Sequence, residues 1–155
     1  MDKISWCKRK REGIRLTEPS PNLAEAYLQK AESSLEALRT TSVRDWKIAA
    51  AYSAMYFSLY AILVRIGVRC EIHSCTIQFA KQFLGSDFTN EEIGFLEDSL
   101  KARIDAQYYV NRNVPDRHYQ EMARRAPKLL VKAKETLLKL NEKKILDIRK
   151  AVERA

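Results

Sequence analysis

The sequence is poor in the residues that make tight turns, with only four glycines and four prolines among 155 residues. An all-β fold needs many such turns and is therefore disfavoured. Three cysteines are too few for a disulfide framework, so we expect no such framework and take a cytoplasmic location as the default. No apolar segment of signal-peptide type opens the chain, and no uncharged window is long enough for a membrane span.

The composition is that of one globular domain, with 46% hydrophobic and 31% charged residues. The net charge of +8 is unevenly spread, since residues 112–155 carry 13 Lys and Arg against 6 acids. Residues 1–19 are also basic, with six cations against three acids, whereas residues 20–111 have nine against eleven. This asymmetry favours contact with an anionic surface, most commonly nucleic acid. A solvated, Lys/Arg-rich helix face is the alternative.

The segment 46–83 is the most informative part of the chain. Between Lys47 and Arg65 it is free of charge. Its apolar and aromatic residues recur in steps of three and four, which predicts a helix: Ala51, Tyr52, Met55, Tyr56, Leu59, Tyr60, Leu63 and Ile66. A helix that is apolar around its whole girth belongs in the middle of a bundle.

The remaining periodicity predicts an all-α fold, an antiparallel bundle of four main helices plus one short helix. The expected helices are 21–39, 43–66, 75–84, 89–108 and a last stretch from 116 that extends toward 152. Ser20, Ser74 and a Thr89–Glu92 capping box are the expected N-terminal caps. Pro127 implies a kink or short break in the last stretch. We divide the chain into a basic leader (1–19), the bundle (20–140) and a charged helical extension (141–155).

Two features of the sequence resemble the HEPN superfamily of small helical domains. The first is the Tyr/Ala-rich helix that ends at Gly67 and is followed by a loop carrying His73. The second is an Arg-x-x-Ala-Asp-Tyr element of a HEPN subgroup without proven activity, matched by Arg103, Ala106 and Tyr108, with Gln107 in place of Asp. The resemblance covers residues 20–140 and implies a HEPN-like bundle that binds nucleotide or RNA without a cofactor.

The resemblance also implies partners. HEPN domains often form homodimers, and they are often encoded beside a minimal nucleotidyltransferase as a toxin–antitoxin pair. A packing argument points to a dimer as well, because the apolar residues of the leader and the narrow tail stripe of Ile145, Ile148 and Val152 need a surface to cover them.

The Arg103 element is the first candidate site. Arg103 would contact a phosphate or nucleotide and Tyr108 would stack or donate, with His73 lining the same groove. Asp105 and Tyr109 lie one turn apart on the same helix and complete this nucleotide-binding set. The alternative is a structural Arg–Asp pair that orients the helix.

The second candidate, Arg112 with His118, matches the Arg…His spacing of HEPN ribonucleases. In a metal-independent endoribonuclease, His118 would be the general acid/base and Arg112 would neutralise the transition state. Pro115 interrupts this motif, and the Arg103 element already occupies the family position. We therefore favour a degenerate, binding domain over the active toxin. By the same resemblance, Tyr119 is a candidate for modification.

Other residues complete the list of candidates. Cys70, His73 and Cys75 lie close together, but no second pair completes a zinc site, so we expect no metal. The expected nucleic-acid contacts are basic: Lys8, Arg9, Lys10, Arg11, Arg124, Arg125 and Lys128, with Lys132 beside them. Three hypotheses remain, namely a nucleotide- or RNA-binding module, an RNase toxin and a ligand-free dimeric scaffold.

Overall fold

The computed structural model describes residues 2–155 and confirms that the chain is a helical bundle. The helices of this described part are α1 (Lys3–Arg9), α2 (Pro21–Thr40), α3 (Arg44–Ile66), α4 (His73–Phe83), α5 (Asn90–Tyr108), α6 (Asp116–Lys139) and α7 (Glu142–Arg154). Two strands, which the sequence did not predict, pair antiparallel: β1 (Arg15–Leu16) and β2 (Val68–Arg69). They join the leader to the link between α3 and α4.

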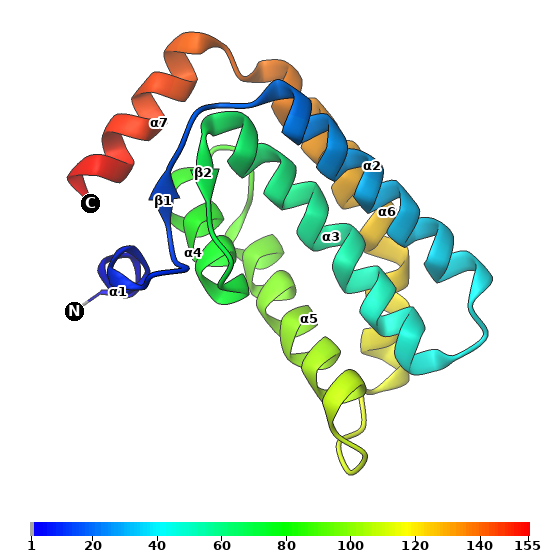
Figure 1. Cartoon of the computed structure of the whole chain (residues 1–155). Coiled ribbons are helices and arrows are strands. Elements are labelled where there is room, and N and C mark those ends of the chain that lie inside the picture. The colour runs from blue at the N-terminus through cyan, green and yellow to red at the C-terminus, as the bar shows by residue number, and fades with distance from the viewer. Residues whose placement is uncertain (1) are drawn as a thin grey trace.

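Helix α3 is the centre of the bundle. It contacts α2, α4, α5 and α6, with α2 beside it and α6 behind the pair (Figure 1). Tyr52, Met55 and Leu59 on this helix are each 1% exposed. By length and hydropathy alone α3 could cross a membrane, but most of its apolar stretch is buried inside this chain. The predicted central position of this helix is confirmed.

Local capping signals correctly predicted several helix ends. The Ser20 hydroxyl accepts a hydrogen bond from the Leu23 amide (3.1 Å) and starts α2. Thr89 and Glu92 form the reciprocal capping box that starts α5. Gly67 ends α3 in the left-handed region, at φ 89°. Each signal depends on residues that are close in the sequence, which is why it can be recognised without the fold.

Two helix boundaries differ from the prediction. Helix α4 begins at His73, and Ser74 does not cap it but accepts a hydrogen bond from Lys3 Nζ (3.4 Å). Helix α6 continues through Pro127, and the break comes after Leu140 instead. There the Asn141 side chain accepts a hydrogen bond from the Lys144 amide (2.8 Å) and caps the start of α7. The position of this cap determines where the helical stretch is interrupted.

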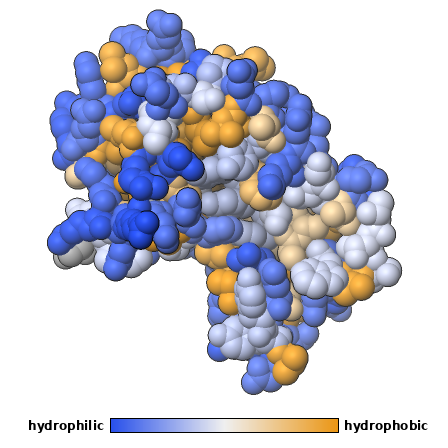
Figure 2. Space-filling model, viewed as in Figure 1, coloured by the Kyte–Doolittle hydropathy of each residue, from blue (hydrophilic) through white to orange (hydrophobic). Residues whose placement is uncertain are grey.

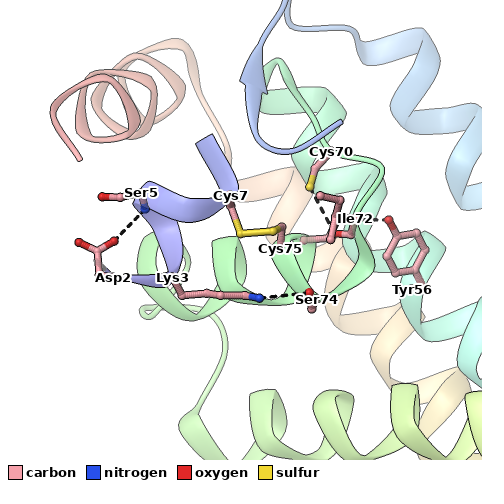
Figure 3. Close-up of a disulfide and its surroundings, with 10 residues drawn as sticks. Asp2, Lys3, Ser5, Cys7, Tyr56, Cys70, Ile72, Ser74 and Cys75 are labelled. Atoms are coloured by element: carbon pink, nitrogen blue, oxygen red, sulfur yellow. Dashed lines mark hydrogen bonds between the residues drawn. A yellow bond between two sulfur atoms is a disulfide. The ribbon is translucent and has the colours of Figure 1, made fainter. Parts of the chain in front are cut away.

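The leader is folded onto the bundle and bonded to it. A disulfide, which the sequence did not predict, joins Cys7 of α1 to Cys75 of α4 (Figure 3). Ile4, Cys7 and Ile14 are buried, whereas Trp6 is 37% exposed. Because disulfides persist mainly in oxidising compartments, the cysteine content no longer supports a cytoplasmic location.

Helix α7 covers its apolar stripe against its own chain. Ile145 and Val152 are buried, and α7 contacts α3 and α4. Arg149 Nη1 donates to the carbonyl oxygens of Thr17, Ile66 and Gly67 at 2.8–3.1 Å. The tail stripe is therefore covered within the chain and gives no packing argument for a dimer. In the leader, the single exposed residue Trp6 is too small a surface to require a partner.

The turn at Gly67 yields a test of this packing. A Cβ on Gly67 would lie 2.3 Å from Arg149 Nη1 and 2.6 Å from the Thr17 carbonyl oxygen, and φ is positive there. We expect Gly67→Ala to lower the free energy of unfolding by about 2 kcal/mol or more in urea titrations. Gly94→Ala is the matched control, because it lies inside α5 with nothing within 4 Å of its Cβ. It should raise stability by about 1 kcal/mol. Equal effects of the two substitutions would contradict this account.

Candidate functional site

A row of tyrosines on α3 forms hydrogen bonds to α4 and to the loop before it. Tyr52, Tyr56 and Tyr60 are spaced by four residues and are 1–7% exposed. Each hydroxyl has a partner: Tyr52 bonds His73 Nδ1 (2.8 Å), Tyr56 bonds the Thr76 hydroxyl (3.2 Å), and Tyr60 accepts from the Cys70 amide (3.1 Å). Burial is the main reason why the pKa of all three is raised. The row is core, as predicted, and its hydroxyls position α4 and the loop before it.

His73 is fixed in place by two of these tyrosines. Besides the bond to Tyr52, its ring stacks on Tyr56 with centroids 3.9 Å apart and planes 7° from parallel. Burial, followed by repulsion from Arg103, lowers the pKa of His73 to about 4. The imidazole is therefore neutral at neutral pH. With Nδ1 engaged, Nε2 is the ring nitrogen that remains for a ligand.

Arg103 of α5 lies beside this histidine without a counter-charge. Its guanidinium is 5.8 Å from the ring centroids of both Tyr52 and Tyr108. No carboxylate within residues 2–155 forms an ion pair with it, so the alternative of a structural Arg–Asp pair does not describe Arg103. We call Tyr52, His73, Arg103 and Tyr108 the His73–Arg103 cluster. It comes from α3, α4 and α5, and it contains three of the five residues predicted to bind nucleotide.

The other two predicted residues belong to a different group. Asp105 pairs with Arg112 at 3.2 Å, and the Arg112 guanidinium lies 3.7 Å from the centroid of the Tyr109 ring. Arg112, predicted to neutralise a transition state, is thus held by a carboxylate and an aromatic ring in the loop between α5 and α6. This arrangement links the two candidate motifs, which the sequence treated as alternatives.

His118 lies in the first turns of α6, beside a cavity of about 290 Å³ that Asp98, Lys101 and Asp105 also line. Its ring packs on Phe95 at 5.4 Å, and its Nε2 is buried without a hydrogen-bond partner. Arg112 is not among the residues that line this cavity. Tyr119, the candidate for modification, is half-buried, with Arg44 5.2 Å from its ring centroid.

The two predicted basic clusters differ in the structure. Arg124, Arg125, Lys128 and Lys132 line one cavity of about 370 Å³ between α5 and α6. In the leader, Lys8 Nζ donates to the Val152 carbonyl oxygen (2.8 Å) and so holds α7. Lys10 lies over the Trp6 ring, and Arg9 and Arg11 are exposed. Figure 2 shows strongly hydrophilic surface over this leader.

The Cys70–His73–Cys75 group has a structural role. Cys75 is in the disulfide, Cys70 is a buried free thiol, and His73 is bonded to Tyr52. The described residues contain no cluster of three or more His, Cys, Asp or Glu that could hold a metal ion.

Comparison of the sequence with known protein families and with curated proteins finds no match. The geometry of the His73–Arg103 cluster therefore has to carry the functional argument. Sequence reasoning found His73, Arg103 and Tyr108 but missed the role of Tyr52, which looked like ordinary core. The separation of 21 residues between Tyr52 and His73 offers no local signal for their bond.

The lowered pKa of His73 predicts a pH dependence of stability. The unfolded chain protonates this histidine near pH 6.5, and the folded protein does so only near pH 4. Because the unfolded state binds the extra proton between these values, the stability gained from neutral His73 is lost as the pH falls through this window. Urea titrations from pH 8 to pH 4 should show wild type losing stability relative to His73→Gln below pH 6.5. A difference that stays constant with pH would contradict the assignment.

Proposed function

We propose that this chain is a HEPN-like helical module with four main helices that binds the phosphate group of a nucleotide or RNA at the His73–Arg103 cluster. The observation that carries the proposal is Arg103, a cation without a carboxylate partner in residues 2–155. It lies 5.8 Å from the centroids of two tyrosine rings and beside a neutral histidine. A guanidinium forms short, charge-assisted hydrogen bonds to phosphate oxygens. Tyr108 is 63% exposed and offers a surface on which a base can stack.

The resemblance to HEPN domains extends the proposal to partners and location. It makes the chain one half of a toxin–antitoxin-like pair with a minimal nucleotidyltransferase, in the cytoplasm. It also favours a homodimer, for which the resemblance is now the remaining support. Of the large apolar side chains left exposed, one (Trp6) belongs to the leader and none belongs to the tail stripe, whereas three are consecutive where α5 ends: Tyr108, Tyr109 and Val110.

The proposal is tested by removing the Arg103 charge. We expect Arg103→Gln to weaken binding of a labelled nucleotide or short RNA about tenfold, or ~1.4 kcal/mol, in fluorescence anisotropy titrations. Arg39→Gln is the control, because it removes the same charge from an exposed arginine at the end of α2. If both variants bind like wild type, the cluster is not the phosphate site. If wild type itself does not bind, the ligand-free dimeric scaffold replaces the proposal.

The second candidate function is a metal-independent endoribonuclease that uses Arg112 and His118. The observation in its favour is the unpartnered Nε2 of His118 beside the cavity that Asp105 also lines. Against it, Arg112 is already paired with Asp105.

We therefore expect total RNA, incubated with purified protein in the presence of a chelator, to remain intact with both wild type and His118→Ala. Cleavage by wild type that is lost in His118→Ala would establish the ribonuclease instead. Gel electrophoresis of the RNA distinguishes the two outcomes.

A further inference from the structure

The cavity between α5 and α6 combines positive charge with an apolar floor. We call it the α5–α6 groove, and its volume is about 370 Å³. Met55 and Leu96, which are 1% and 2% exposed, form part of the floor, together with Phe95 and Leu129. None of the residues that line it belongs to the His73–Arg103 cluster. The groove is therefore lined by a set of residues separate from that cluster.

The cations of the groove retain hydrogen-bond donors for a ligand. Arg124 and Arg125 each use two N–H groups in bonds to a glutamate, Glu121 and Glu91 respectively. A guanidinium has five N–H donors, so three remain on each. Lys132 is bonded to Glu92, which belongs to the groove, while Lys128 has no ion-pair partner within residues 2–155.

The charge balance of the groove favours an anion. Its four cations exceed the three neighbouring carboxylates, even when Glu91 and Glu121 are counted with Glu92. Glu91 is 70% exposed and Glu121 is 41% exposed, and neither lines the groove. The Arg124–Glu121 pair is exposed on both sides and contributes little to stability, so a ligand can replace it at low cost.

Arg125 is the least exposed of these cations. Its guanidinium lies 4.0 Å from the centroid of the Phe95 ring, and its side chain is 23% exposed. Stacking on an aromatic ring and a bidentate bond to Glu91 fix the plane of the fork before any ligand arrives. Preorganised donors lose less entropy on binding than free surface side chains.

We propose that the α5–α6 groove binds phosphate groups of a single-stranded RNA whose other nucleotides occupy the His73–Arg103 cluster. This inference rests on the proposed function and specifies its ligand as an RNA strand. Phe95 and Arg103 are eight residues apart on α5, or about 12 Å along the helix axis, a distance that a few linked nucleotides span. A mononucleotide fills one of the two sites, whereas a strand with repeating phosphates fills both. The apolar floor suits the bases and riboses of such a strand.

The test measures anisotropy of a labelled eight-nucleotide RNA at several salt concentrations. Lys128→Gln should weaken binding three- to tenfold and lower the slope of log K against log salt by about 0.7, the value for one phosphate contact on a single strand. Arg124→Gln should act in the same way. Lys150→Gln is the matched control, since it removes one charge from an exposed position on α7, away from the groove.

The outcomes separate this inference from the proposed function. If Arg103→Gln weakens RNA binding but Lys128→Gln and Arg124→Gln behave like Lys150→Gln, RNA binding by the α5–α6 groove is disproved and the proposed function stands. If wild type binds ATP but no RNA at low salt, this inference fails and the proposed function stands, and if it binds neither, both fail. With ATP as the second probe, a loss of ATP binding in Lys128→Gln without a change in RNA binding overturns the RNA strand as the occupant.

Discussion

The hydrogen bonds made by the buried tyrosines of α3 are the constraint on which the rest of the molecule depends. A hydroxyl taken out of water without a partner is costly, so the hydroxyls of Tyr52, Tyr56 and Tyr60 need partners inside the bundle. Those partners come from His73, Thr76 and Cys70, within seven residues of one another. The central helix thereby fixes the start of α4, where burial and the nearby Arg103 lower the pKa of His73.

The segments near both ends of the chain contact the link between α3 and α4 or the start of α4. The disulfide attaches α1 to α4, β1 pairs with β2, and Arg149 of α7 binds the carbonyls around Gly67. His73 is only a few residues from all of these contacts. The His73–Arg103 cluster is thus supported by segments that the sequence suggested were peripheral additions to the bundle.

Sequence reasoning succeeded where the determining interactions are local. The ends of α2 and α5 follow from Ser20 and from the Thr89–Glu92 box, and the central place of α3 follows from its apolar girth. It failed where partners are distant in the sequence. Nothing near Cys7 in the sequence points to Cys75, which is 68 residues away, as its disulfide partner. Nothing near Asp105 shows that it forms its ion pair with Arg112 rather than with Arg103. The site was predicted as a set of residues, but the split of that set into two groups requires the fold.

The contacts of α7 have a consequence for the order of assembly. Lys8 and Val152 are 144 residues apart, and Arg149 and Thr17 are 132 apart. Closing such long loops costs entropy that only a nearly complete bundle can offset, and contacts of this kind slow folding. The α2–α3 hairpin, whose contacts are local, has no such delay. We therefore expect the contacts of the leader and α7 around Gly67 to form last, after the core that holds His73 has formed.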